Sequence, residues 1–249
     1  MLEAAIKYKT IVDEFDDAIK AGEFKMYLQP QISAKTRRLT GAEALVRRIK
    51  PDGTIISPID FIPVYEKSGL ISRLDRYIWE QAAAKLGEWK KAGINMSISV
   101  NISPKDFYYI DIFNTFAGLI KKYDIEPSNL KIEITETTIM SDVPNLMGEL
   151  EELRKAGFTL EMDDFGSGYS SLNTLKDINV DVLKVDMGFI KETKNVKKSR
   201  IILASVIKMA KELNLLIITE GVETEEQVDN LTKLGCDVFQ GYYFSKPIP

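Results

Sequence analysis

The sequence predicts an α/β barrel of eight strands that alternate with helices, and three observations lead to this fold. Short runs rich in β-branched residues precede longer amphipathic stretches of helical period along nearly the whole chain. Repeated strand–helix units favour a mostly parallel sheet. Acids or amides stand at or near the carboxyl ends of seven of the eight predicted strands, and a closed barrel brings those ends to one face. A doubly wound open sheet is the second candidate, but it would not converge so many strand ends.

The predicted elements follow in regular order after a leading helix at residues 2–21. The eight strands are expected at residues 25–28, 41–47, 96–101, 131–135, 159–163, 182–186, 216–220 and 238–242. The other helices are expected at residues 58–67, 72–92, 104–123, 143–156, 170–176, 199–213 and 224–234. Gly93, Gly157 and Gly235 stand where helices end, at positions typical of a C-terminal cap.

Composition excludes several classes of function. The 249 residues carry 33 Lys and Arg against 37 Asp and Glu, and a net charge of −4 disfavours duplex nucleic acid or an anionic membrane as a partner. The single cysteine, Cys236, excludes an internal disulfide, and the absence of histidine excludes imidazole catalysis and histidine-ligated zinc. Any metal ion is therefore expected to have oxygen ligands, which favours Mg²⁺, Mn²⁺ or Ca²⁺.

The chain is expected to form a single domain over residues 1–249 that was taken from a longer protein. No apolar run approaches the roughly 20 residues of a membrane span, and the N-terminus lacks the apolar core of a signal peptide. These observations predict a cytoplasmic location.

Strand parity predicts a cluster of carboxylates at the mouth of the barrel. Glu133 points to one face of its strand, and Glu136 lies on the other. Asp163 and Asp164 are adjacent at a predicted turn, so each can reach a different cation. Lys184 has the inward parity of its strand, and a buried lysine requires carboxylates or an anion. Two divalent ions roughly 3.5–4 Å apart would activate water for displacement at phosphorus. The alternative is a salt-bridged barrel layer, using Lys184 and Arg47, without chemistry.

The residues in this cluster belong to a series of motifs. They are LQP at 28–30, EALVR at 43–47, SVNIS at 99–103, EITE at 133–136, DDFGSGYSSL at 163–172, KVD at 184–186, EGVET at 220–224 and QGYYFSKP at 240–247. In this order and spacing the sequence resembles the EAL domain family of bacterial cyclic di-GMP phosphodiesterases, over nearly its whole length. The resemblance implies a TIM-like (β/α)8 barrel with one antiparallel strand.

The resemblance also implies the activity, which is hydrolysis of the second messenger cyclic di-GMP to linear pGpG by a water activated by two metal ions. The implied metal ligands are Glu43, Asn101, Glu133, Asp163, Asp164 and Glu220. Lys184 and Gln240 correspond to residues near the attacking water, and Glu220 and Glu136 complete the catalytic set, with Glu136 bracing the loop after Asp163. Mg²⁺ or Mn²⁺ is the expected cofactor, whereas Ca²⁺ is expected to bind with poor or no activity.

Further residues are assigned by the same resemblance. Arg47 corresponds to an arginine that binds a substrate phosphate. The remaining groove residues are Gln29, Leu45, Glu223 and Pro247. The loop at 163–171 and the helix after it correspond to the family's dimer interface, so a homodimer is expected. Three positions depart from the family: Arg48 stands where many members have tryptophan, Glu161 where a small residue is common, and MGF at 187–189 where an arginine and a serine often stand. Glu161 has the inward parity, so it is expected either to add a carboxylate to the site or to pair with Lys184.

Two other interpretations remain at this point. In the first interpretation the domain is a catalytically silent cyclic di-GMP receptor. In the second it is a metal-dependent barrel enzyme that acts on a sugar or an organic acid. The intact ligand positions favour the phosphodiesterase over the receptor, and the ordered motifs favour it over the other barrel enzymes.

Overall fold

The computed structural model describes residues 2–141, 143–165, 175–188 and 196–249. Its strands are β1 (Phe24–Ser33), β2 (Leu39–Ile49), β3 (Ile55–Ile56), β4 (Ser97–Ile102), β5 (Leu130–Thr135), β6 (Leu160–Asp163), β7 (Val182–Asp186), β8 (Leu216–Glu220) and β9 (Val238–Gln240). All eight predicted strands are present, and the two-residue β3 is additional.

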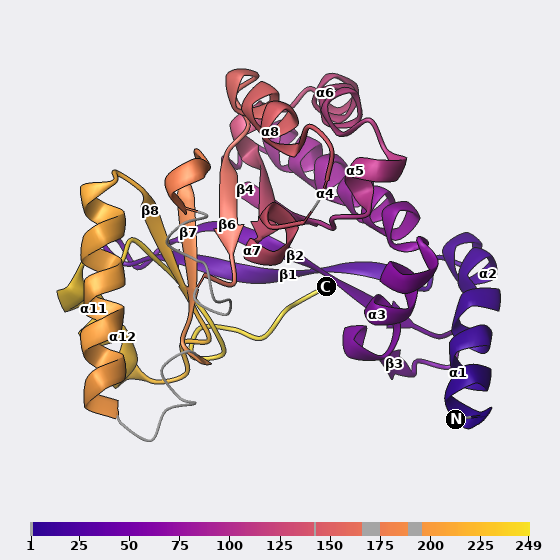
Figure 1. Cartoon of the computed structure of the whole chain (residues 1–249), viewed down its shortest axis with the longest axis horizontal. Helices are drawn as coiled ribbons and strands as arrows, with labels where there is room; N and C mark the ends of the chain where they lie inside the picture. Colours follow the sequence, from indigo (N-terminus) through magenta and orange to yellow (C-terminus); the bar gives the residue numbers. More distant parts are fainter. Residues whose placement is uncertain (1, 142, 166–174, 189–195) are drawn as a thin grey trace.

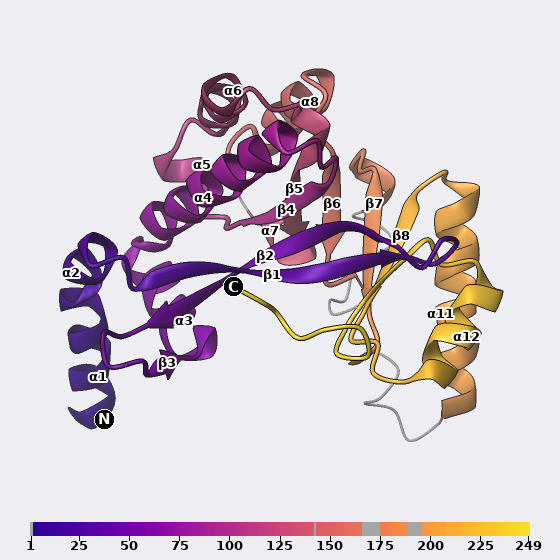
Figure 2. The ribbon, with the colours of Figure 1, turned by 180° about the vertical axis from the view of Figure 1, so that it is seen from behind.

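The strands form a closed barrel, which confirms the predicted fold. Strands β2 and β4 to β9 pair in parallel, and β1 pairs antiparallel with both β2 and β9. The reversed strand is therefore β1, the position that periodicity alone did not reveal. The β1–β2 ribbon also extends beyond the barrel, where β3 pairs with the end of β2 (Figures 1 and 2).

Helices cover the outside of the barrel and its extension. The first half contains α1 (Leu2–Asp13), α2 (Phe15–Lys20), α3 (Pro58–Ser68), α4 (Ile71–Lys91), α5 (Asp106–Tyr109) and α6 (Ile112–Tyr123). The second half contains η1 (Pro127–Asn129), α7 (Glu136–Ile139), α8 (Leu146–Lys155), α11 (Val196–Glu212) and α12 (Glu225–Leu234). In Figures 1 and 2, α1 to α3 surround the outer end of the β1–β2 ribbon, and α11 and α12 lie at the opposite end of the molecule.

Two predicted helices are each divided in the structure, and one helix was not predicted. The leading helix is interrupted at Glu14, whose carboxylate accepts a hydrogen bond from Arg48 at 2.7 Å. The helix expected at 104–123 is two helices, because Asp111 caps α6 by accepting from the Asn114 N–H at 3.0 Å. The short helix α7 was not predicted. The helix expected at 170–176 falls largely outside the described residues.

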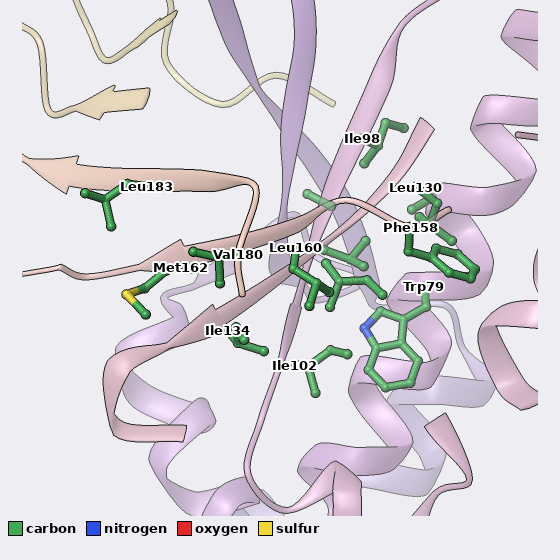
Figure 3. Packing of buried hydrophobic residues seen from close by; sticks show 14 of the residues in the cluster. Trp79, Ile98, Ile102, Leu130, Ile134, Phe158, Leu160, Met162, Val180 and Leu183 are labelled. Carbon is green, nitrogen blue, oxygen red and sulfur yellow. The ribbon is translucent and has the colours of Figure 1, made fainter. Parts of the chain in front are cut away.

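The apolar core lies between the outer face of the barrel and its helices. On β4, β5 and β6 the even-numbered residues Ile98, Ile102, Ile134, Leu160 and Met162 are at most 3% exposed. Figure 3 shows several of these side chains gathered beside Trp79 of α4. Because side chains alternate along a strand, the odd-numbered residues of these strands point into the barrel, and most of them are polar.

In the parts of the chain that the structure describes, no helix combines the length and apolar character that crossing a membrane requires.

Candidate active site

The side chain of Lys184 lies at the centre of the barrel and is fully buried. Its Nζ is 2.8 Å from Glu133 Oε2 and 2.9 Å from Glu220 Oε1. It is also 3.3 Å from Glu43 Oε2 and 3.4 Å from Asp163 Oδ1. Strands β2, β5, β6, β7 and β8 therefore bring four predicted metal ligands around one ammonium group.

The charges in this cluster act strongly on one another. Burial alone would lower the pKa of Lys184, but the charges of Glu133, Glu220 and Glu43 raise it well above its usual range. Burial, followed by the charge of Glu43, raises the pKa of Glu133, and Lys184 opposes the rise. Burial also raises the pKa of Glu220 to about 8 against the influence of Lys184. A cluster that holds more carboxyl groups than one ammonium can neutralise is suited to receive additional cationic charge.

Amide side chains complete the centre of the site. Gln240, the last residue of β9, donates from Nε2 to Glu43 Oε2, and also to Glu220 Oε1 at 3.0 Å. Asn101 Nδ2 donates to Glu43 Oε1 at 3.3 Å. Gln31 Nε2 donates to Gln240 Oε1 at 3.1 Å, and sequence reasoning missed this residue although it has the same parity as Gln29. These contacts place both oxygens of Glu43 at fixed positions.

A glycine allows Gln240 to reach this position. A Cβ atom at Gly241 would lie 2.2 Å from the carbonyl oxygen of Val222, so no other residue fits there without a shift. The close approach is held by the Val222 N–H, which donates to the Gln240 carbonyl at 3.1 Å. The end of β9 is thereby fixed against the loop that follows Glu220.

The predicted turn after β6 is present. Asp163 ends the strand, and Asp164 has a φ of +55°, the left-handed conformation of a turn residue. Glu136 is the first residue of α7 and is 2% exposed. Its predicted role as a brace concerns the loop to residue 171, and residues 166–171 lie outside the described residues.

Two hollows flank the carboxylate cluster and share Leu45. One, of about 330 Å³, is lined by Gln29, Glu43, Leu45, Glu220, Gly221, Glu223, Gln240, Gly241 and Tyr242. The other, of about 270 Å³, includes Leu45, Arg47, Ile62, Glu66, Asp75, Trp79 and Asn101 in its lining. Neither lining contains Pro247, which precedes Ile248 in the tail that pairs with β1. A ligand with two bulky ends and a polar centre can therefore extend across the site.

Two of the departures from the family, Arg48 and Glu161, have clear structural roles. Arg48 is 3% exposed and donates to Glu23 at 2.9 Å as well as to Glu14, so it fastens the N-terminal helices to β2. Glu161 points into the barrel, as its parity indicates, but it pairs with Lys131 at 2.9 Å.

The chemistry of the donors fits divalent cations. Glu133 Oε1 is buried and has no hydrogen-bond partner among the described residues, and hard cations prefer such carboxylate oxygens. Within those same residues no three acids form a ready-made cation site, and the Lys184 ammonium lies among the acids. The lysine therefore supplies in part the positive charge that the acids require.

Beside the Asn101 strand, a second pair of acids lies under the hollow that Arg47 lines. Asp106 is fully buried, accepts a hydrogen bond from the Ser103 N–H at 2.7 Å, and is hydrogen-bonded to Asp75. Burial raises the pKa of Asp106 to about 6, although the hydrogen bond from the Ser103 N–H opposes the rise. Burial and then the charge of Asp106 raise the pKa of Asp75 well above its usual range.

We expect the Asp106→Asn variant to gain stability relative to the parent as the pH rises. Between the ordinary value of 3.8 and about 6, the folded protein holds a proton on Asp106 that the unfolded chain has released. The parent therefore loses stability as the pH rises through this window, by about 3 kcal/mol, and the asparagine variant does not. Urea unfolding of both proteins from about pH 4 to about pH 7 measures the difference. Asp229→Asn, on the exposed face of α12, is the matched control, and a pH-independent difference for Asp106→Asn would contradict the expectation.

The chain is similar to known proteins both in sequence and in structure. A family model described as "EAL domain" matches residues 12–247. The signalling protein YkoW of Bacillus subtilis is 37% identical over 233 residues, covering 94% of this chain and 29% of YkoW. The cyclic di-GMP phosphodiesterase RocR of Pseudomonas aeruginosa is 32% identical over 228 residues, covering 92% of this chain and 58% of RocR. The solved structure of the PaMucR phosphodiesterase in complex with c-di-GMP has a TM-score of 0.89 and 33% identity, covering 96% of this chain and 98% of that one.

The chain therefore belongs to the EAL domain family. It spans less than two thirds of the length of YkoW and of RocR.

Proposed function

We propose that this domain hydrolyses one phosphodiester bond of cyclic di-GMP in a reaction that requires divalent metal ions, and that the product is linear pGpG. The observation that carries the proposal is the convergence of Glu43, Glu133, Asp163 and Glu220 on the buried ammonium of Lys184. The relatives named as cyclic di-GMP phosphodiesterases support the choice of substrate.

The proposed metal ligands are Glu43, Asn101, Glu133, Asp163, Asp164 and Glu220. Two bound ions of Mg²⁺ or Mn²⁺ would supply Lewis acidity at the phosphate and a water of lowered pKa. Lys184 holds the ligands together and its ammonium can orient a water through its hydrogens. Gln240 fixes Glu43 and Glu220 relative to each other. The role proposed for Glu136 is to brace the loop after Asp164.

The two hollows provide places for the two halves of the substrate. Gln29 and Glu223 line one hollow, Arg47 lines the other, and Leu45 lies between them. Pro247 would belong to the rim. The hollow beside Arg47 contains apolar side chains together with the carboxyl groups of Glu66 and Asp75, which can accept the N–H donors of a purine base.

Replacement of Arg47 by alanine is expected to weaken cyclic di-GMP binding by about 10- to 100-fold. Arg47 Nη1 donates to its neighbour's carbonyl, Val46 O, at 2.8 Å, so the fork has further donors for a phosphate. A hydrogen bond to a charged group contributes about 1.5–3 kcal/mol. Calorimetric titration in Ca²⁺ measures the affinity, with Arg200→Ala on the surface as control. An unchanged dissociation constant in the Arg47 variant would disprove the assignment.

The proposed enzyme and the alternative, a silent receptor, differ in turnover and not in binding. The experiment therefore measures both on the same metal-stripped protein, with Mg²⁺, Mn²⁺, Ca²⁺ or excess chelator added back. We expect pGpG with Mg²⁺ or Mn²⁺, little or none with Ca²⁺, and none with chelator. Tight binding without any pGpG under all four conditions would favour the receptor, and full activity in chelator would contradict the metal requirement.

The expected homodimer, cytoplasmic location and single domain are also proposals. A homodimer through the loop at 163–171 and the helix after it involves residues that are mostly outside the described part of the chain. A cytoplasmic location and a single domain over residues 1–249 stay predictions.

A further inference from the structure

A second layer of charge lies in the barrel interior below the proposed metal ligands. Lys131 stands two residues before Glu133 on β5, and Glu161 is the register partner of Glu133 on β6. The Lys131 ammonium is 2.9 Å from Glu161 Oε1. The Glu161 side chain is fully buried, and its second oxygen, Oε2, has no hydrogen-bond partner among the described residues.

The two charges of this pair lie at different depths. The side chain of Lys131 is 18% exposed and reaches a hollow of about 380 Å³. Thr40, Ser97, Leu216 and Val238 also line that hollow, and each stands at the beginning of a parallel strand, so the hollow is the amino-terminal mouth of the barrel. Glu161 lies between this mouth and the site, two residues before Asp163 on the same strand face.

We propose that the Lys131–Glu161 pair tunes the affinity of the site for divalent cations, with Glu161 strengthening cation binding and Lys131 limiting that effect. The proposal rests on the proposed function, because it concerns the same metal ions. Glu161 acts through the field of its charge, and so it is a positioning residue. Glu161 is the register partner of Glu133 and stands two residues before Asp163, and its full burial leaves its charge poorly screened.

This arrangement predicts a result that a purely structural ion pair would not produce. In Glu161→Gln the negative charge is lost and the Lys131 ammonium below the site is left without its carboxylate, so Mn²⁺ binding is expected to weaken by about 10-fold. Removing that ammonium in the Lys131→Met/Glu161→Gln double variant is expected to regain most of the lost affinity. If the pair only held two strands together, the second substitution would restore nothing.

The test is a titration of metal-free protein with Mn²⁺, in which electron paramagnetic resonance follows the free ion, so that the readout does not depend on hydrolysis. The proteins are the parent, Glu161→Gln, the double variant and Lys35→Met, a matched control that removes a lysine of the same mouth with no ion pair to Glu161. Circular dichroism establishes that each protein is folded. If Glu161→Gln does not fold, Glu161→Met is used in its place.

We expect the affinities to rank as parent, then double variant, then Glu161→Gln, with Lys35→Met equal to the parent. A double variant that binds Mn²⁺ no more tightly than Glu161→Gln overturns the tuning role while leaving the proposed function intact. A folded parent that binds no Mn²⁺ overturns the metal centre itself, and with it both proposals.

Discussion

The Glu43→Gln variant is expected to lose about 1000-fold or more in kcat for cyclic di-GMP hydrolysis while its affinity for the substrate stays within a few-fold of the parent. Glu43 is the point where three donors meet: Lys184, Asn101 and Gln240 all lie within 3.3 Å of its two oxygens. A glutamine would remove the charge and turn an N–H₂ group toward donors. Loss of one metal ligand removes several kcal/mol of charge stabilisation, which corresponds to a factor of this size in rate.

Initial rates at saturating Mn²⁺ and a calorimetric titration of substrate in Ca²⁺ measure the two quantities separately for Glu43→Gln. Glu126→Gln, an exposed carboxylate before η1, is the matched control. A Glu43 variant that retains a tenth of the parental kcat would show that Glu43 is not a metal ligand.

The second large effect is expected at Lys184. Replacing this fully buried lysine by methionine leaves Glu133, Glu220, Glu43 and Asp163 without the cation that lies within 3.4 Å of each. Removing one partner from a buried ionic cluster costs about 3–5 kcal/mol, and uptake of protons by the acids offsets part of this. We therefore expect the metal-free variant to unfold roughly 10 °C below the parent.

Divalent cations are expected to restore most of the thermal stability that Lys184→Met loses, because they can neutralise the same carboxylates. The rate of hydrolysis by this variant should nevertheless remain below one hundredth of the parental rate. Thermal unfolding with Mn²⁺ and with chelator separates the two effects. Lys211→Met, which breaks a surface ion pair with Asp237, is the matched control. A metal-free Lys184→Met protein as stable as the parent would mean that the lysine does not offset the charge of the acids.

Strands with an apolar face against the helices could be predicted closely from the sequence. The bounds of β1 and β2 were predicted less well. β5, β6, β7 and β8 were found almost to the residue, because alternate positions face helices and are apolar. β1 was predicted at 25–28 but continues to Ser33, because Gln29 and Gln31 point into a polar barrel interior and interrupt the apolar pattern. Glu43 likewise lies in the first half of β2 and not near its end, since that strand continues beyond the barrel to pair with β1 and β3.

The members of the site could be proposed from parity and motif order, but their partners could not. Parity placed Lys184 among carboxylates, and the structure brings it to Glu43, Glu133, Asp163 and Glu220. For Glu161 parity gave the direction of the side chain but not its partner, because Lys131 and Lys184 are both cations that an inward carboxylate on β6 can reach. The structure pairs it with Lys131, which stands two residues before Glu133, the register partner of Glu161.

The mass of the product formed from cyclic di-GMP in water enriched in the heavy isotope of oxygen shows whether this domain hydrolyses the substrate. Metal-stripped protein is incubated with substrate and Mn²⁺ for a single turnover, and the nucleotides are analysed by mass spectrometry. We predict pGpG that carries one heavy oxygen atom on its terminal phosphate, and none of this product when chelator replaces Mn²⁺. Unchanged cyclic di-GMP from folded, Mn²⁺-bound protein, or a product without the heavy oxygen, would contradict the proposed metal-dependent hydrolysis.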